Sequence, residues 1–210
     1  NAAARVAGLD IGFAPQEGGY DLEGILEGAS SGDVKTVILL GADELDMSRL
    51  GDSFVVYVGT HGDAGAHRAD VILPGATYTE KQAIYVNTEG RAQMTEQAAF
   101  PPGEAREDWK IFRALSEVLG EKLPYDNVET LRARMFEVAP NLASLDELTD
   151  AGSPDVSALT INVSLSDAPF TNSVQDFYFT NPIARASKIM AECSIQAQAT
   201  NVSEGTGTDG

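Results

Sequence analysis

Cysteine is nearly absent from this sequence of 210 residues, in which Cys193 is the only one. A single thiol cannot close a disulfide within the chain, and it cannot supply the paired cysteines of a structural zinc site. An iron–sulfur cluster needs about four protein thiolates. We therefore expect this chain to build none of these by itself, and we interpret Cys193 as a small buried or half-buried residue.

Basic residues are also few, with 14 Lys and Arg against 32 Asp and Glu, which gives a net charge of -18. Such a surface repels phosphate backbones and anionic lipid headgroups, so nucleic acid and direct membrane binding are disfavoured. No apolar run approaches the length of a membrane span, because the longest, such as residues 37–40, have the length of a strand. We therefore expect a folded domain without direct membrane insertion.

The first half of the sequence has the rhythm of an α/β fold. Asp21 precedes a short helical pattern that ends near Gly32. Continuous apolar runs predict strands at 34–40, 54–58 and 71–73, with a shorter extended piece at 84–87. The first run is typical of a strand buried on both faces in a parallel sheet. The fold class predicted is therefore α/β, with a partial doubly wound, mostly parallel sheet and flanking helices.

Two helices are predicted after this sheet. The first, at 104–119, places an apolar stripe toward the sheet, with Phe112 and Leu115 at its centre, and Gly120 fits the position after its end. The second, at about 127–139, is ended by Pro140. The stripe of the first helix comprises Ile111, Phe112, Leu115, Val118 and Leu119.

The last third of the sequence differs in character. We expect three parts: an α/β domain at 1–150, an extended tail at 151–193, and a disordered end at 194–210. Within the tail, alternating apolar residues at 159–165 indicate an edge strand, and Pro182 begins a short helix that reaches Ala191. The apolar segment 176–193 predicts docking onto another surface, with 150–158 as a flexible tether.

One glycine-rich segment follows a strand at its carboxyl end, where open α/β sheets bind ligands. It reads Gly59-Thr-His-Gly-Asp-Ala-Gly and lacks the spacing of a dinucleotide fingerprint or a P-loop, and no helix clearly begins after it. A cofactor loop and a turn that needs glycine for positive φ or close packing are both open, and the second is favoured. His61, Asp63 and His67 form only a weak metal pattern.

The charged residues downstream of this loop favour a structural interpretation. Asp70, Glu80 and Lys81 are expected to form hydrogen-bonded charge pairs, with Arg91 as one possible partner, that fix the path of the chain. Glu89-Gly90-Arg91 stands in a segment that looks too irregular for a plain helix or hairpin. We therefore predict no catalytic, cofactor-binding or metal-binding residue in this chain.

Residues 69–93 carry a resemblance to a known family. They read Ala-Asp-Val-Ile-Leu-Pro-Gly-Ala-Thr-Tyr-Thr-Glu-Lys and, after a short gap, Val-Asn-Thr-Glu-Gly-Arg-Ala-Gln. The segment resembles the end of the molybdopterin-oxidoreductase fold. The flanks, Val58-Gly-Thr-His-Gly-Asp-Ala-Gly-Ala and Pro101-Pro-Gly-Glu-Ala-Arg-Glu-Asp-Trp, look like a branch without the pterin cofactor, the large iron–sulfur subunit of respiratory complex I. The resemblance runs in order from about Ala3 to Cys193.

The resemblance implies a function for the whole subunit. Complex I passes electrons from NADH through a flavin and 4Fe-4S and other iron–sulfur clusters to ubiquinone and couples this to proton translocation. The clusters would lie upstream, since the sequence starts at Asn1 without an initiator Met and resembles only the C-terminal part of that subunit. Partners would be other peripheral-arm subunits, including the flavin-bearing NADH-binding subunit. The location would be the inner (cytoplasmic or mitochondrial) membrane, peripherally, on its cytoplasmic or matrix side.

Two other functions remain open on the sequence. In a molybdenum or tungsten oxidoreductase the 59–91 region would line a working pterin site, because such loops hold cofactor phosphates through backbone N–H groups in active relatives. A free-standing acidic binding module is the third possibility. Metal content distinguishes the first from the complex I subunit, and cooperative unfolding of the isolated chain tests the third.

Overall fold

The computed structural model describes residues 5–147, 152–153, 155, 167–171, 174 and 176–203. The chain divides into two compact units, Asn1–Thr149 and Asp150–Gly210. The first contains α1 (Arg5–Asp10), α2 (Leu22–Ser31), β1 (Thr36–Leu40), η1 (Met47–Leu50), β2 (Phe54–Gly59), α3 (Ala64–Arg68), β3 (Val71–Pro74), β4 (Ile84–Val86), β5 (Ala92–Met94), α4 (Asp108–Val118), α5 (Val128–Val138) and η2 (Pro140–Ala143). The second contains η4 (Phe177–Phe179), α6 (Pro182–Arg185) and α7 (Lys188–Ser203).

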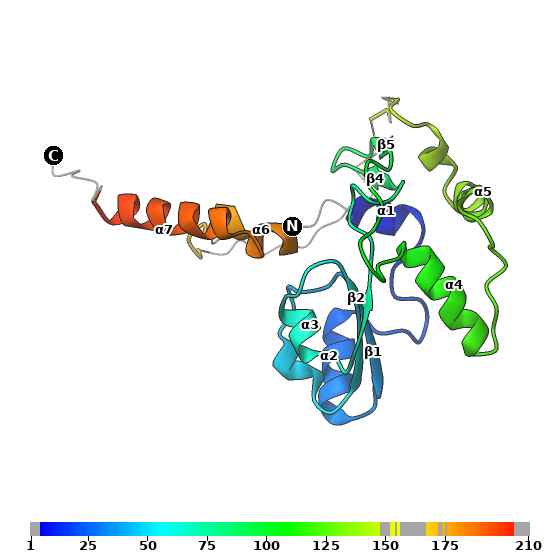
Figure 1. Ribbon diagram of the computed structural model, residues 1–210, viewed down its shortest axis with the longest axis horizontal. Coiled ribbons are helices and arrows are strands. Elements are labelled where there is room, and N and C mark those ends of the chain that lie inside the picture. Colours follow the sequence, from blue (N-terminus) through cyan, green and yellow to red (C-terminus); the bar gives the residue numbers. More distant parts are fainter. Residues whose placement is uncertain are drawn as a thin grey trace. The chain divides into compact units, whose positions relative to one another are not determined.

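A parallel sheet of three strands in the order β1-β2-β3 organises the first unit (Figure 1). Val37 lies opposite Val55 across the first pair, and Val58 lies opposite Leu73 across the second. These runs are rich in β-branched residues, which fit a pleated surface between neighbouring strands. The three predicted strands and the α/β class are therefore confirmed.

One face of this sheet carries the core of the unit. Helices α2 and α3 lie on the same side of the strands in Figure 1, and their apolar residues pack with those of β1, β2 and η1. Helix α2 begins as predicted, because Asp21 Oδ1 accepts a hydrogen bond of 2.9 Å from the Gly24 amide. It ends at Gly32, whose φ of 86° favours glycine. The buried members of the core are Leu26, Ala29, Val37, Leu39, Leu50, Val55 and Tyr57.

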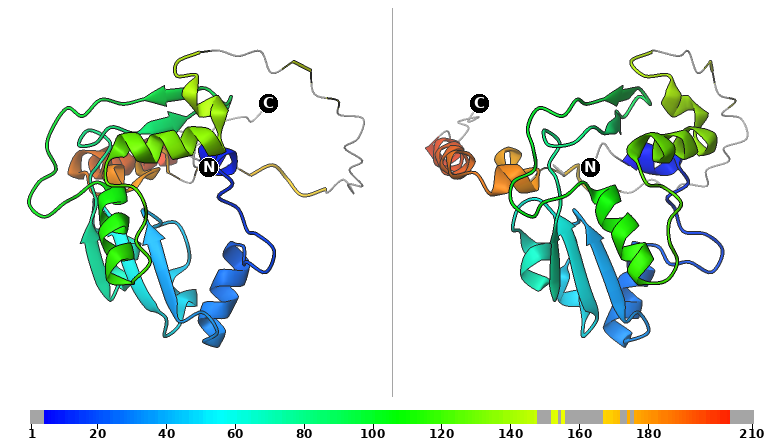
Figure 2. Two further views of the ribbon diagram at one scale, coloured as in Figure 1. Left: turned by 90° about the vertical axis from the view of Figure 1, so that its right-hand side faces the viewer. Right: turned by 45° about the vertical axis from the view of Figure 1, so that its right-hand side comes forward.

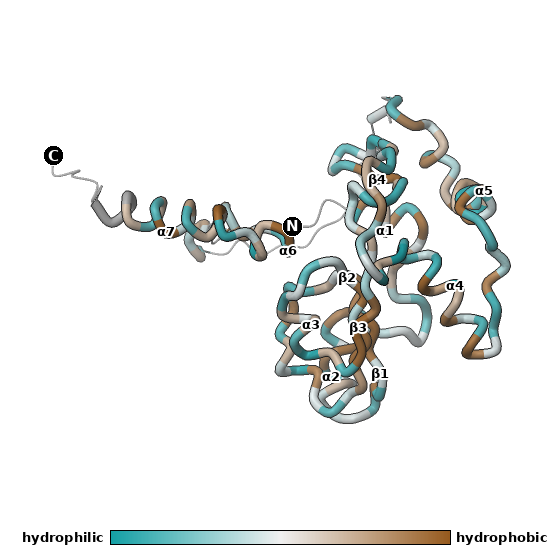
Figure 3. The backbone as a smooth tube through the Cα atoms, viewed as in Figure 1, coloured by the Kyte–Doolittle hydropathy of each residue, from teal (hydrophilic) through white to brown (hydrophobic). Residues whose placement is uncertain are grey.

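The second face of the sheet is open in the described part of the chain. Ile38, Leu40 and Phe54 are 46%, 56% and 49% exposed, and burial alternates along β1. Figure 3 shows hydrophobic residues concentrated along these strands. The prediction of a strand buried on both faces is therefore wrong for this structure. An apolar run on both faces records which residues a strand carries, but not which element covers them.

Helix α4 lies on the side of the sheet opposite to α2 and α3 (Figures 1 and 2), yet none of its residues is buried. It begins at Asp108, not at the predicted residue 104, because the chain before it extends the sheet edge. The Arg106 amide donates to Pro74 O (3.0 Å), and the Ala76 amide donates to Arg106 O (2.9 Å). Phe112 faces a groove shared with the chain leading to α5. The prediction that Phe112 and Leu115 are buried against the sheet is wrong.

A second, smaller core joins the antiparallel hairpin β4–β5 to α5, η2 and α1. Its buried residues are Val86, Ala92, Ala139 and Leu142. The extended piece expected at 84–87 is β4, while its partner β5 had not been predicted. Helix α5 lies where the sequence predicted it, with Asn127 Oδ1 accepting from the Thr130 amide (2.8 Å), and Pro140 begins η2.

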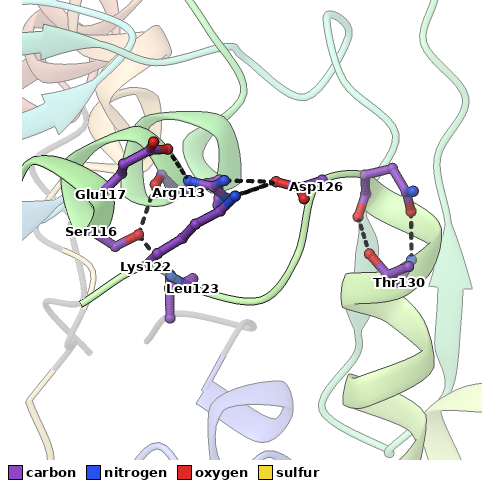
Figure 4. A network of polar contacts seen from close by, with 8 residues as sticks. Arg113, Ser116, Glu117, Lys122, Leu123, Asp126 and Thr130 are labelled. Carbon is purple, nitrogen blue, oxygen red and sulfur yellow. Dashed lines mark hydrogen bonds and ion pairs between the residues drawn. The ribbon is translucent and has the colours of Figure 1, made fainter. Parts of the chain in front are cut away.

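Charged side chains tie α4 to the loop that precedes α5 (Figure 4). Arg113 donates through Nη2 to Asp126 Oδ1 (2.7 Å) and through Nη1 to Glu117 Oε2 (2.8 Å). Ser116 Oγ accepts from the Leu123 amide at 3.0 Å. Hydrogen bonds from Arg113 hold the pKa of Asp126 and that of Glu117 below their usual values. The path of the loop therefore depends on these ion pairs.

Acid is expected to loosen this loop. A carboxylate with a lowered pKa stabilises the folded state above its unfolded pKa, and this contribution is lost as pH falls through the folded value. The ordinary pKa of Asp126 is 3.8, so the loss falls below pH 4. Hydrogen exchange at the Leu123 amide, corrected for the intrinsic rate, should show protection that declines in this range. In Asp126→Asn the decline should be smaller, and an unchanged profile would contradict this role.

The second unit has its own polar framework. Asp176 caps η4 by accepting from the Tyr178 amide (2.8 Å) and also accepts from the buried hydroxyl of Ser194 in α7. Asn181 caps α6 with Pro182 at its first position, as predicted. The chain turns at Ser187 and then continues as α7 to Ser203. The sequence prediction of a helix ending at Ala191, followed by disorder from 194, therefore differs from the structure up to residue 203. The predicted edge strand at 159–165 lies outside the described residues.

Candidate functional site: the glycine-rich loop after β2

The loop from Gly59 to Gly65 lies at the carboxyl end of the parallel sheet, the usual ligand-binding edge of open α/β folds. A short helix, α3, begins at Ala64 directly after it, which corrects the expectation that no helix follows. Helix α3 is short because its last turn gives way to extended backbone at Ala69. A ligand at this edge would need free backbone N–H groups and space beside the glycines.

The amides at the end of the loop are already engaged within the chain. Asp63 Oδ1 accepts from the Ala64 amide (2.9 Å), and Asp43 Oδ1 accepts from the Gly65 amide (2.9 Å). Asp43 follows β1 and is buried, at 7% exposure. A buried carboxylate requires hydrogen-bond donors, and these backbone groups supply them. The loop therefore presents its donors to its own carboxylates.

The side chain of Tyr57 occupies the space beside the glycines. Its hydroxyl donates to Asp43 Oδ2 at 2.9 Å, and the residue is 2% exposed. A Cβ atom on Gly59 would come within 2.4 Å of the Tyr57 hydroxyl, and one on Gly65 within 2.7 Å of its ring. Neither glycine has a positive φ. The two glycines are therefore explained by close packing against Tyr57, the structural alternative that the sequence favoured.

These contacts also decide how well the loop fits a pterin cofactor. Phosphate groups would need the loop amides and the volume next to Gly59 and Gly65, and both are taken by Asp43, Asp63 and Tyr57. The residues present do not fit that group, and no chemical step is assigned to it. An iron–sulfur cluster has no set of thiolates in this chain, whose one cysteine is Cys193.

The histidines of the loop make separate contacts. His61 Nδ1 lies 2.8 Å from Thr60 Oγ1, and the backbone amide of His67 donates to Asp63 O within α3. Among the described residues, no three His, Cys, Asp or Glu side chains are grouped so that they could hold a metal ion. The arrangement therefore supports packing and capping roles for the loop.

Replacing His61 and His67 together with Gln is expected to leave NADH oxidation by the assembled protein within about twofold of the parent, because Gln keeps hydrogen-bonding capacity and, among the described residues, neither ring lies in a group of metal ligands. The measurement is the turnover of complex purified at equal subunit content. A large loss of turnover with normal assembly would assign a chemical role to the loop.

Each charged residue downstream has its own partner. Asp70 Oδ2 accepts from the Val55 amide (2.7 Å) and lies 3.5 Å from Arg68. Glu80 accepts from the Thr77 amide (3.0 Å), and Lys81 pairs with Asp108 (2.5 Å). None of these contacts involves Arg91, so the suggested pairing with it is corrected. The path-fixing role is nevertheless the one that these contacts perform, because they join β2, β3 and α4.

The Asn-Thr-Glu-Gly-Arg segment forms the turn of the β4–β5 hairpin. Asn87 Oδ1 accepts from the Glu89 and Arg91 amides (3.0 and 2.9 Å), and Gly90 has a φ of 87°. Arg91 donates to the backbone oxygen of Asp146 at 3.1 Å, a residue with a positive φ of 62°. The expectation that this segment is too irregular for a hairpin is wrong. Side-chain capping by Asn87 and the left-handed conformation of Gly90 explain why charged residues occupy a tight turn.

Comparison with known proteins agrees with this geometry. Residues 1–118 match the model of the molybdopterin oxidoreductase family, which covers more than half of the chain. The chain therefore belongs to the molybdopterin oxidoreductase family. Residues 147–193 match a narrower family, a C-terminal domain that is specific to one subunit of NADH-ubiquinone oxidoreductase. The chain thus carries the features of the complex I branch, as the resemblance of the sequence indicated.

Similar full-length proteins carry the same assignment in their names. The chain is 48% identical over 193 residues to NADH dehydrogenase [ubiquinone] iron-sulfur protein 1, mitochondrial, of Solanum tuberosum, covering 91% of this chain and 25% of that protein. It is 46% identical over 199 residues to the mitochondrial NADH-ubiquinone oxidoreductase 78 kDa subunit of Candida albicans, covering 91% of the chain and 26% of the relative. The counterpart of Neurospora crassa is 43% identical, with 92% and 26% covered. The chain spans about a quarter of the length of these relatives.

The helices of the described residues are all too short or too polar to cross a membrane.

Proposed function

We propose that this chain is a segment of the large iron–sulfur subunit of respiratory complex I and serves there as a structural and assembly scaffold without a redox centre of its own. The complete enzyme would pass electrons from NADH through iron–sulfur clusters to ubiquinone and couple this to proton translocation. The clusters would be held by other parts of the subunit. The chain itself would contribute a rigid α/β body and contact surface.

One observation carries the scaffold role: Tyr57 and Asp43 fill the loop where a relative with a pterin would hold its cofactor. The hydroxyl–carboxylate bond of 2.9 Å is buried, and the Gly65 amide completes it. A loop closed in this way favours packing over ligand binding. This supports the complex I subunit over the molybdenum or tungsten oxidoreductase, and the named relatives support it over a free-standing acidic module.

The partners that this function implies are other subunits of the peripheral arm, including the flavin-bearing NADH-binding subunit. The location would be peripheral on the inner membrane, on the matrix or cytoplasmic side. Two features support contact with proteins over contact with lipid. The net charge is -18, which disfavours anionic headgroups, and apolar side chains such as Ile38 and Leu40 are exposed on the sheet.

Co-purification tests this proposal. A tag on the chain, within its complete protein, should isolate a particle from membranes that oxidises NADH with a quinone acceptor and contains iron and acid-labile sulfide. A matched preparation from an untagged strain is the control. Recovery of the tagged protein without this activity and without other subunits would reject the proposed function.

The second unit is proposed to anchor the chain in the assembly. Phe177, Ile189 and Ile195 are exposed on η4 and α7, and exposed apolar residues of this number are costly in water. We expect deletion of residues 176–210 to lower the yield of assembled complex on native gels at least about tenfold, as the loss of an interface hot spot would. Deletion of 204–210 should be harmless.

A truncation at residue 194, which the sequence alone suggests is tolerated, removes Ser194 and half of α7 and should also impair assembly. Its effect separates the two interpretations of the tail. Normal complex in the 176–210 deletion would show that the unit is not an anchor.

A further inference from the structure

An apolar groove lies between α4 and the chain that leads into α5. Its volume is about 140 Å³, and almost all of its exposed lining is apolar. We call it the α4–α5 groove. It is lined by Trp109, Phe112, Arg113, Leu123, Tyr125 and Leu131. No residue of either helix is fully buried, so these aromatic and aliphatic side chains are only partly covered by the described residues.

The walls of the groove are held by polar contacts that leave its interior apolar. The indole Nε1 of Trp109 donates to Glu107 (3.1 Å), and the guanidinium of Arg113 is engaged by Glu117 and Asp126. The Leu123 amide is held by Ser116 Oγ (Figure 4). Because the polar atoms of these residues already have partners, what the groove offers a ligand is apolar and aromatic surface of fixed shape. This is the lining that interface pockets for anchor side chains have.

The rim of the groove is acidic. Residues 113–131 contain four acidic side chains and two basic ones, and Glu121 and Glu129 are exposed with no ion pair among the described residues. The other two acidic residues are shared with Arg113 and Lys122. With a net charge of -18 for the chain, this rim favours a partner that carries basic groups. Small anionic ligands are disfavoured for the same reason.

We propose that the α4–α5 groove binds a segment of a neighbouring subunit, in which an apolar side chain enters the groove and flanking Lys or Arg residues pair with Glu121 and Glu129. The inference rests on the proposed function, because it requires a multisubunit assembly. It goes beyond that function by naming the contact surface and the chemistry of the partner. A flexible basic segment with one apolar anchor fits both the shape of the groove and the charge of its rim.

Site-specific photo-crosslinking in the assembled complex tests this contact. A photoreactive phenylalanine analogue replaces Leu123, which lines the groove and is 39% exposed, or Val118, which lies outside it and is 84% exposed. Exposure alone would favour adducts at Val118. The proposal predicts an adduct from position 123 to another subunit, at least about fivefold more abundant than any adduct from position 118 to the same peptide. The crosslinked peptide should contain an apolar residue flanked by Lys or Arg.

Charge variants give a second readout. Glu121→Gln with Glu129→Gln should lower retention of that partner at moderate salt and flatten the salt dependence of its release. Leu123→Asp should reduce the retained partner about tenfold. Val118→Asp should leave it unchanged. Circular dichroism of the variants shows that the helices are kept.

The outcomes separate this inference from the function on which it rests. If the tagged protein does not co-purify with NADH-oxidising subunits, the proposed function fails. If it does, an adduct from position 123 confined to its own polypeptide, equal adducts at 118 and 123 to the same peptide, or salt-independent release in both forms would overturn the groove proposal alone.

Discussion

Replacing Tyr57 with Ala is expected to lower the free energy of unfolding of the α/β unit by about 3–5 kcal/mol, the range for large aromatic truncations in cores. Tyr57 is 2% exposed and packs against β1, α2 and α3. The change leaves a cavity beside Gly59 and Gly65 and removes a donor from the buried carboxylate of Asp43. Both losses act on the same site, so the effect should be among the largest in the chain.

Tyr57→Phe separates the two contributions. It keeps the ring that fills the glycine loop and removes only the hydroxyl, so it should cost about 1–3 kcal/mol for the carboxylate left with fewer donors. Hydrogen exchange of the β1 and β2 amides in the complete protein measures both variants, because it reports the local opening free energy. Equal protection in Tyr57→Ala and the parent would show that the ring does not close the loop.

Leu50→Ala is the second change with a large expected effect. Leu50 is 0% exposed at the end of η1, where it packs under α2 and the sheet. Truncating a buried leucine costs about 2–5 kcal/mol, through lost transfer free energy and the cavity that remains. The same exchange measurement on β1 amides should show the loss. Val118→Ala is the matched control, since Val118 is 84% exposed and its truncation should change protection by less than about 0.5 kcal/mol. Similar effects in the two variants would contradict the assigned core.

The sheet was predictable from the sequence because its signals are local. Continuous β-branched runs such as 36–40 specify strands, and Asp21 with Gly32 marks both ends of α2. The burial of the second face was not predictable, since Ile38 and Leu40 look the same in a sequence whether or not another element covers them. Helix α4 began late for a similar reason. Arg106 satisfies its backbone groups at the sheet edge, a choice made by tertiary contacts and not by helix propensity.

The chemistry of the loop also depends on residues distant in the sequence. Asp43, Tyr57 and Gly65 come from three elements, so no spacing rule connects them. The sequence could offer close packing as one reason for the glycines, but it could not identify the side chain that fills the space. The β4–β5 hairpin was missed because its turn depends on the Asn87 carboxamide and on Gly90 at positive φ, amid charged residues that obscured the strand pattern. The length of α7 was missed because its alanines and glutamines favour a helix without an apolar face.

The central claim is that a molybdopterin-oxidoreductase fold serves here as scaffold in a complex that carries its redox centres elsewhere. Metal and pterin analysis of the complete protein, purified with its native partners, tests this most directly. The predicted result is iron and acid-labile sulfide in stoichiometric amounts, with molybdenum, tungsten and released pterin well below one equivalent. Stoichiometric molybdenum or tungsten together with a released pterin would contradict the account, because the loop closed by Tyr57 and Asp43 would then have to hold a cofactor.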